Sequence, residues 1–222
     1  MAKPLVRKRG THTDTCPTKK PKCDCGCNPL DDEDFARMHL PVELWSASKE
    51  GLSPKIRDPI EKFCGRILEV KSKNVGLFLY GKGGSGKTGA ASVVLKEARA
   101  WGFTAYAASV TVLREAVRTY AAFDNESSII DRARSVDFFL LDDLRAEDAQ
   151  EKFFTINDVR NLIVSRHDRG LPTLITSLLA PIAWGKLAPG ILAAIDKCCA
   201  VQLVEGPDRH EAAQRFKSTF LK

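Results

Sequence analysis

The stretch "FLYGKGGSGKTGA", residues 78–90, decides the fold. Within it Gly81, Gly86, Lys87 and Thr88 satisfy the spacing G-x-x-x-x-G-K-[ST] of a phosphate-binding loop. An apolar run precedes the loop and a helical pattern follows it, so backbone N–H groups and the positive end of a helix can face one anion. The stretch therefore predicts a nucleoside-triphosphate site.

The side chains of this loop have separate expected tasks. Glycine is needed because positive φ must be accessible and because side chains would hold the anion away. Lys87 is expected to reach the β- and γ-phosphates of ATP, and the Thr88 hydroxyl is expected to bind Mg²⁺. The predicted nucleotide contacts in the loop are Gly81, Gly83, Gly84, Ser85, Gly86, Lys87, Thr88 and Gly89.

Two adjacent carboxylates predict the metal side of the site. The apolar run 138–141 leads into Asp142 and Asp143, at the carboxyl end of a predicted strand. Ligands bind at that end of the strands in open α/β sheets. We expect Asp142 to bind Mg²⁺, directly or through water, and Asp143 to polarise the attacking water, although these roles can exchange. The alternative is that both acids only cap a strand.

Three further residues are candidates for contact with the nucleotide. Thr176 and Ser177 end another predicted strand, and their hydroxyls would lie beside the γ-phosphate if that strand sits between the first and the third. Arg209 follows the last strand, and its planar, permanently charged fork suits a phosphate. Structural roles at a strand end and in solvent are the respective alternatives.

From residue 75 onward, short apolar runs alternate with helical segments. This alternation predicts an α/β fold of the P-loop type, with five parallel strands between crossover helices. The strands are expected at 75–81, 104–109, 137–143, 172–178 and 199–205. The helices are expected at about 87–100, 111–122, 126–135, 153–169 and 190–197, and from about 208 onward.

The chain divides into three predicted parts: a tail over 1–34, a helical lead-in over 35–72 and the P-loop domain over 73–222. The tail shows no apolar periodicity and should pack no core of its own. In the lead-in, a single helix is expected to brace the domain through residues that recur at helical spacing. These are Ile60, Phe63, Ile67 and Leu68.

Charge is concentrated in the tail, where residues 1–30 carry seven Lys or Arg against two Asp in a chain of net charge +6. Such an arm suits nucleic acid, because neutralised phosphates release counterions. A solvated tail is the alternative. No apolar window approaches the roughly 18–20 residues of a membrane span, and no signal peptide is evident, so we expect a cytoplasmic protein with no membrane contact.

Cysteines are clustered in the same tail. An odd total of seven, without an export signal, points to free thiols or metal ligands rather than disulfides. A zinc site is one prediction, although the C-x-C-x-C spacing is tighter than the usual C-x₂-C; a disordered thiol-rich tail and redox chemistry are the alternatives. The candidate ligands are Cys16, Cys23, Cys25 and Cys27, with His12 nearby. Cys64, Cys198 and Cys199 are expected to be core residues.

From about His39 to Arg209 the chain resembles the DnaC-like helicase loaders of bacteria and their phages, and the related IstB-like transposition helper ATPases. The segments that carry the resemblance are "LPVELWSAS", "GLFLYGKGGSGKT", "FFLLDDLRAED", "IVSRHDRGLPTLITSLL" and "VQLVEGPDRH".

The resemblance implies an AAA+ ATPase with a five-stranded sheet, little or no lid, and a capacity to form homo-oligomers. It implies a replicative ring helicase and single-stranded DNA as partners, with a zinc-bearing tail as a helicase-docking module. A transposition helper that acts on duplex DNA is one alternative, and a weakly hydrolysing nucleotide-dependent adaptor is another.

The sequence also departs from the family pattern. Leu178 stands where the family usually has Asn, and "ILAAIDKCC" lacks the usual arginine finger. Arg166 or Arg169 of a neighbouring subunit is then the candidate finger. His210 occupies the expected position of the closing arginine, with Arg209 beside it.

Overall fold

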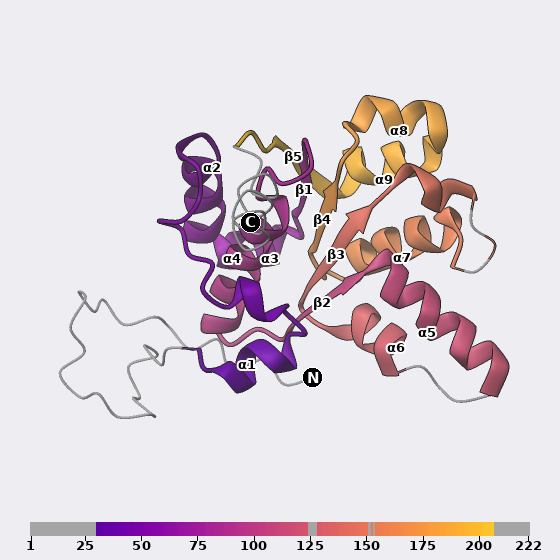
Figure 1. Ribbon diagram of the computed structural model, residues 1–222, viewed down its shortest axis with the longest axis horizontal. Coiled ribbons are helices and arrows are strands. Elements are labelled where there is room, and N and C mark those ends of the chain that lie inside the picture. The colour runs from indigo at the N-terminus through magenta and orange to yellow at the C-terminus, as the bar shows by residue number, and fades with distance from the viewer. Residues whose placement is uncertain (1–29, 124–127, 151, 153, 207–222) are drawn as a thin grey trace, which may run out of the picture.

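The computed structural model describes residues 30–123, 128–150, 152 and 154–206. They contain a five-stranded parallel sheet in the order β2-β3-β4-β1-β5, with helices on both faces (Figure 1). This confirms the predicted architecture. The strands are β1 (Gly76–Tyr80), β2 (Ala105–Ser109), β3 (Phe138–Leu144), β4 (Thr173–Ser177) and β5 (Cys199–Leu203).

One face of the sheet is covered by α2 (Pro54–Gly65), α3 (Ile67–Lys73) and α4 (Lys87–Ala100). The other face is covered by α5 (Val110–Phe123), α6 (Ser128–Ser135), α7 (Ile156–Asp168), α8 (Pro181–Leu187) and α9 (Pro189–Cys198). Figure 1 shows the two groups of helices on opposite sides of the strands. Shorter helical segments are α1 (Asp32–Arg37), η1 (Val42–Leu44) and η2 (Ala146–Gln150). The sequence did not predict α8.

Successive residues of a strand point to opposite faces of the sheet, so a continuous apolar run makes both faces apolar. In β1, Leu77 and Leu79 pack in the cluster that includes α2 and α4, while Phe78 packs in the cluster that includes α7 and α9. A strand buried on both faces has no polar alternation to show. The apolar runs of the sequence, which end abruptly in polar residues, therefore place those polar residues at the rim of the sheet.

The lead-in differs from the prediction of a single helix. Helix α2 ends at Gly65, Arg66 has φ −113°, and α3 starts at Ile67. Glycine is a poor helix former, and this break changes the direction in which the following residues point. Ile60 and Ile67 are buried and Phe63 is partly buried, but Leu68 is 40% exposed, so its predicted place on the packed face is wrong.

The segment before α2 runs along the outer edge of β2. The Ala107 N–H donates to the Met38 carbonyl at 2.8 Å, and Arg99 binds Asp34 with its guanidinium. The Lys96 ammonium donates to the carbonyl oxygens of Leu44, Trp45 and Ala47. An edge strand presents unpaired backbone groups, and covering it protects the sheet from pairing with another chain.

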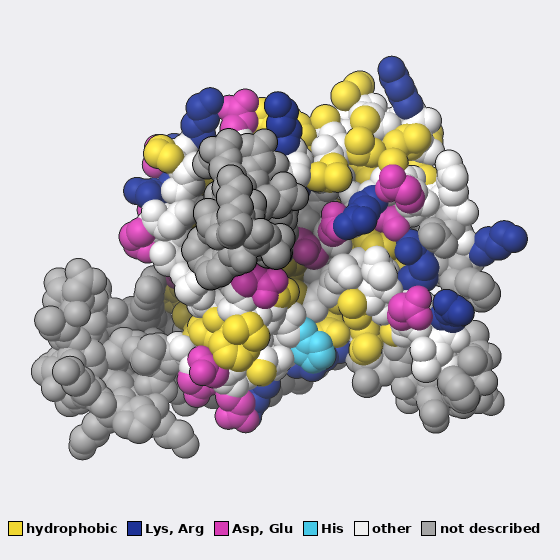
Figure 2. Space-filling view, in the orientation of Figure 1, with side chains coloured by type: hydrophobic (Ala, Val, Ile, Leu, Met, Phe, Trp, Pro, Cys, Tyr) yellow, Lys and Arg dark blue, Asp and Glu magenta, His cyan; other side chains and the backbone are white. Residues whose placement is uncertain are grey.

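The cysteines, the exposed apolar side chains and the length of the helices complete the description of the fold. Cys64 and Cys198 are buried and Cys199 is half-buried, all as free thiols. Apolar side chains gather on the surface over α8, where Ile182 is 73% exposed (Figure 2). In the described residues, no helix combines the length and the apolar character needed to cross a membrane.

Candidate nucleotide-binding site

The phosphate-binding loop connects β1 to α4, and its backbone has positive φ at three glycines, Gly81, Gly84 and Gly86. Gly81 has φ +149°, and a Cβ placed there would lie 2.3 Å from the Val204 carbonyl oxygen of the chain leaving β5. Gly86, the residue before α4, has φ +96°. The loop therefore turns tightly into the first turn of a 14-residue helix, whose free N–H groups and positive end suit an anion.

Two side chains of the loop point to the same ligand. Ser85 is 5% exposed, and its hydroxyl has no hydrogen-bond partner among the described residues. The Lys87 ammonium donates to the carbonyl oxygens of Gly81 at 2.9 Å and Lys82 at 2.7 Å. Burial lowers the pKa of Lys87, while the charges of Asp143 and Asp142 act in the opposite direction. A buried hydroxyl without a partner and a buried cation fit the oxygens of a polyphosphate.

Asp142 forms the centre of the predicted metal side. Its Oδ1 accepts hydrogen bonds from the Thr88 hydroxyl at 3.0 Å and the Thr176 hydroxyl at 2.6 Å. Burial raises the pKa of the Asp142 carboxyl, and the two hydroxyl donors partly offset this effect. A carboxylate and a hydroxyl within 3.0 Å are the oxygen donors that Mg²⁺ prefers, so these residues fit the metal.

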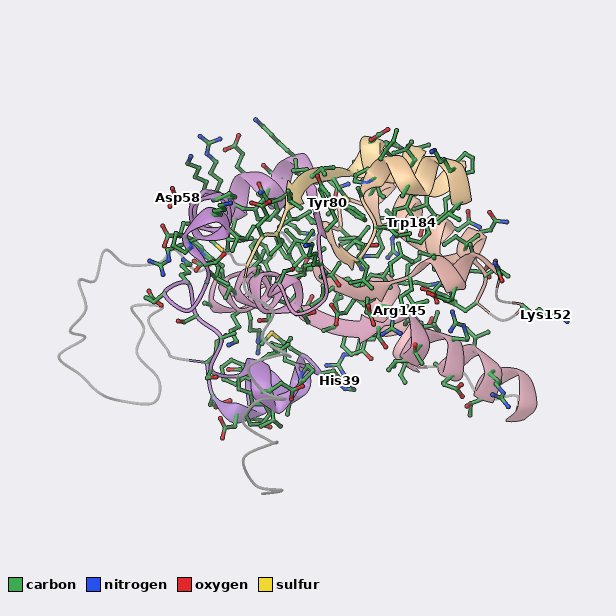
Figure 3. The ribbon with its side chains drawn as sticks, turned by 45° about the horizontal axis from the view of Figure 1, so that its top comes forward. His39, Asp58, Tyr80, Arg145, Lys152 and Trp184 are labelled. Carbon is green, nitrogen blue, oxygen red and sulfur yellow. The ribbon has the colours of Figure 1, made fainter. Side chains whose placement is uncertain are left out.

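Asp143 is held in an unusual backbone conformation. Its φ is +61°, its N–H donates to the Thr176 hydroxyl at 2.8 Å, and the pairing of β3 with β4 shifts between Leu141 and Leu144. A bulge of this kind re-aims a side chain at the rim of a sheet. The Asp143 carboxylate is consequently bound by Arg145, whose Nε lies 2.7 Å from Oδ2. Figure 3 marks Arg145 where β3 ends and Tyr80 where β1 ends.

Arg145 was not among the predicted site residues. Its signal in the sequence is its position two residues after a carboxylate at a strand end, close enough along the chain for an arginine side chain to reach back. That signal is weak, since an arginine after a strand is common and most are solvated. The pairing becomes visible only in three dimensions.

The two hydroxyl candidates on β4 are placed differently. Strand β4 does lie between β1 and β3, as the prediction required. Thr176 faces Asp142, whereas the Ser177 hydroxyl donates to the Leu144 carbonyl at 2.8 Å and accepts from the Leu179 N–H and the Trp184 indole. A hydroxyl has one proton to donate, so a phosphate oxygen would have to displace Leu144 from Ser177.

The structure corrects the view of Arg166 as an arginine finger. Arg166 is fully buried and donates to Thr173 Oγ1 at 3.0 Å and to the carbonyl oxygens of Ala133 at 2.6 Å and Pro172 at 3.0 Å. Burial lowers the pKa of Arg166 to about 9. Its partners are the first residue of β4 and residues that precede β3 and β4, so Arg166 and the nearby Arg169 lie at the edge of the sheet opposite the phosphate-binding loop.

A small cavity of about 200 Å³ adjoins the metal side of the site. Thr88, Asp142 and Ser109 line it from the domain, and the lead-in closes it with residues between His39 and Leu44. His39 has φ +55° and meets the Tyr106 ring edge-on at 4.9 Å. Nothing in the local sequence marks these lead-in residues as neighbours of the site, because the contact is made across the sheet edge.

Several predicted residues lie outside the part of the chain that the structure describes. These are Arg209 and the candidate zinc ligands Cys16, Cys23, Cys25 and Cys27. Among the described residues, no group of three or more His, Cys, Asp or Glu side chains could hold a metal ion. The role of Arg209 and the zinc site stay predictions.

The sheet order, the glycine loop ahead of α4 and the paired aspartates at the end of β3 define an AAA+ type of P-loop fold. No protein-family model matches the sequence, and no curated protein matches it. Solved structures with this fold do match. The three described next share 16%, 18% and 21% sequence identity with the chain, so the likeness concerns the fold.

Two of these structures are of the kind that the sequence resembles. DnaI is 21% identical, with a TM-score of 0.64 over 75% of this chain and 95% of that chain. The DnaC helicase loader is 18% identical, with a TM-score of 0.62 over 74% of this chain and all of that chain. The replication initiator DnaA bound to AMPPCP and single-stranded DNA is 16% identical, with a TM-score of 0.61 over 75% of this chain. That match spans 51% of the DnaA chain. The chain thus has the fold of the DnaC-like loaders and of DnaA.

Proposed function

We propose that the chain binds ATP with Mg²⁺, hydrolyses it, and acts in DNA replication as a helicase loader. The observation that carries the ATPase part is the contact of Asp142 with both Thr88 and Thr176, because it joins the phosphate loop, β3 and β4 in one polar cluster. A carboxylate that only capped a strand would not need the hydroxyl that opens α4.

The residues of the site divide the work between binding and hydrolysis. The backbone of the loop, Ser85 and Lys87 bind the phosphates, while Thr88 and Asp142 hold Mg²⁺, which when bound neutralises charge on the β- and γ-phosphates. Asp143 orients and polarises the attacking water. Thr176 fixes both aspartates, since its hydroxyl accepts from the Asp143 N–H and donates to the Asp142 carboxylate.

The loader part of the proposal is supported by the fold and by charge. DnaI and the DnaC helicase loader match over nearly their whole length, and a DnaA of the same fold holds single-stranded DNA. The basic arm of residues 1–30 suits phosphate neutralisation. We therefore propose a replicative ring helicase and single-stranded DNA as partners, and a homo-oligomer formed on DNA.

One observation favours the adaptor as a second candidate. Of the two candidate fingers, Arg166 and Arg169, Arg166 is buried and has no access to a neighbouring subunit. An ATPase without an arginine at the γ-phosphate hydrolyses slowly, since that arginine contributes about 10³-fold or more to turnover in P-loop enzymes. A slow enzyme would serve as a nucleotide-dependent switch.

Turnover measurements separate these functions. Wild type is compared with Lys87→Ala, Asp143→Asn and the control Lys62→Ala, whose side chain is exposed on α2. An ATPase should lose most of its rate in the first two variants and keep it in the control. Equal rates in all four proteins would favour the adaptor.

Two assays test the loader part: co-purification with a hexameric helicase, and salt-sensitive binding of a single-stranded oligonucleotide. Filaments that form on duplex DNA in the presence of ATP would instead favour a transposition helper.

A further inference from the structure

Arg145 combines an anchored backbone with an exposed side chain. Its N–H donates to Asp148 Oδ2 at 2.7 Å, which anchors the residue directly after β3. The side chain is 58% exposed and reaches back to the Asp143 carboxylate. The hydrogen bond to Asp143, together with the charges of Asp143, Asp148 and Glu147, raises the pKa of Arg145, so the guanidinium stays positively charged.

The partner of Arg145 is the carboxylate expected to polarise water. Asp143 is close enough to the loop for its charge to raise the pKa of Lys87 against the effect of burial. Arg145 binds the Asp143 carboxylate at the carboxyl end of β3, the edge of the sheet where the phosphate-binding loop lies. While Arg145 holds Oδ2, that oxygen is occupied by a charge-assisted hydrogen bond and is a poor acceptor for water.

We propose that Arg145 is the arginine that binds the γ-phosphate within the same chain, and that it exchanges Asp143 for this phosphate when a nucleoside triphosphate binds. The inference rests on the proposed ATP site. A γ-phosphate offers three oxygens and more negative charge than one carboxylate, and a guanidinium binds such an anion with a two-pronged fork. A diphosphate lacks this group and leaves Arg145 on Asp143.

The exchange would couple nucleotide recognition to hydrolysis. Arg145 would move from Asp143 to the triphosphate, and Asp143 would then be free to accept a hydrogen bond from the attacking water. An arginine supplied in the same chain is an established way to stabilise charge at the transferred phosphoryl group. The same chain would therefore sense the triphosphate and complete the site without a neighbour's arginine.

The positions of other arginines support the assignment. Arg166 and Arg169 lie at the amino ends of the strands, at the opposite edge of the sheet from Arg145. Arg114 is only 16% exposed and is bound to Asp148 at 2.5 Å. Arg145 stands at the carboxyl edge of the sheet, next to Asp143, with an exposed side chain.

Binding constants for AMPPCP and ADP test the proposal without relying on turnover. They are measured by calorimetry for wild type, Arg145→Ala, Arg145→Lys and the control Arg118→Ala, whose side chain is 68% exposed and pairs with Glu115 at 3.7 Å. Arg145→Ala should weaken AMPPCP binding by about 10-fold or more, as expected for loss of a charge-assisted hydrogen bond, and leave ADP binding within about 2-fold. Arg145→Lys should recover part of the loss, and Arg118→Ala should match wild type.

The outcomes distinguish the inference from the function on which it rests. If wild type binds neither nucleotide, the proposed ATP site fails and the assignment of Arg145 fails with it. If wild type binds both and Arg145→Ala keeps the wild-type ratio of the two constants, only the assignment of Arg145 is overturned. A faster turnover with an unchanged ratio would also overturn it, because Arg145 would then merely restrain Asp143. Thermal unfolding of Arg145→Ala at the wild-type temperature shows that the variant is folded.

Discussion

Thr88 and Asp142 lie 54 positions apart in the chain, yet the Thr88 hydroxyl donates to the Asp142 carboxylate at 3.0 Å. The contact joins the first turn of α4 to the end of β3, and Thr176 adds β4 to the same carboxylate. Three elements thus converge on one oxygen atom. The cluster is built before any ligand-dependent movement is needed, which reduces the entropy cost of binding a metal there.

The charged Asp142 carboxylate is expected to lower the stability of the metal-free fold and to strengthen the binding of Mg²⁺. Burial raises the pKa of its carboxyl, so the folded chain binds this proton more tightly than the unfolded chain. Protonation therefore stabilises the fold, and that contribution is lost as pH rises through the folded-state pKa. Asp142→Asn removes the buried charge and keeps an oxygen that accepts from Thr88 and Thr176. In metal-free buffer near neutral pH it should raise the melting temperature, and it should weaken Mg²⁺-dependent nucleotide binding by about 10-fold or more.

The melting temperatures of wild type and Asp142→Asn, measured between about pH 5 and pH 8 with and without Mg²⁺, test this expectation. Stabilisation by Asp142→Asn should shrink toward the acid end, where the wild-type carboxyl binds a proton. Asp58→Asn, an exposed change on α2 (Figure 3), should shift neither the melting temperature nor the binding. A variant that melts below wild type in metal-free buffer at neutral pH would contradict the argument.

Arg166→Ala should destabilise the fold by about 2–4 kcal/mol. The change leaves the buried carbonyl oxygens of Ala133 and Pro172 without this donor and removes the guanidinium that lies over Phe139. Arg166→Lys should rescue little, because an ammonium cannot reproduce the planar fork. Urea unfolding at equilibrium measures the effect. Arg169→Ala, at an exposed position nearby, should cost less than about 0.5 kcal/mol; equal losses in the two variants would mean that burial does not decide the role of Arg166.

Much of the fold and part of the site follow from local sequence. The strand ends at Tyr80 and Ser109, the start of α4 at Lys87 and the pair Asp142–Asp143 are each marked by an apolar run that meets polar or glycine residues. Periodicity locates such boundaries because a buried parallel strand and an amphipathic helix differ in their repeat.

Contacts between distant segments could not be predicted in this way. The link from Thr176 to both aspartates, the burial of Arg166 and the pairing of Met38 with the edge of β2 each depend on which elements become neighbours. The prediction for Leu68 was wrong because the helix breaks at Arg66. A break at one residue changes the direction of every side chain that follows it.

The cysteine tail yields a prediction that concerns metal content alone. If Cys16, Cys23, Cys25 and Cys27 bind zinc, the purified chain should carry about one zinc ion, as expected for four thiolate ligands. Elemental analysis measures the metal, and Cys23→Ser together with Cys25→Ser should remove it. Cys64→Ser, a change in the core on α2, should leave the metal in place in the folded fraction. A full complement of zinc in the double variant would exclude Cys23 and Cys25 as ligands.

Gly81 and Gly83 are neighbours in the same loop but should respond oppositely to alanine. At Gly81 the φ of +149° is strained for alanine, and the new Cβ would lie 2.3 Å from the Val204 carbonyl oxygen, which belongs to backbone and cannot swing aside. At Gly83, apart from the glycine and its two chain neighbours, no atom of the described residues lies within 4 Å of the added Cβ. Gly81→Ala should therefore destabilise the fold by about 2 kcal/mol or more, whereas Gly83→Ala should stay within about 0.5 kcal/mol of wild type. Urea unfolding of both variants checks this difference. AMPPCP binding by Gly83→Ala then shows how close a bound phosphate comes to the loop. A large loss of affinity in a stably folded variant means that the backbone at Gly83 touches the anion.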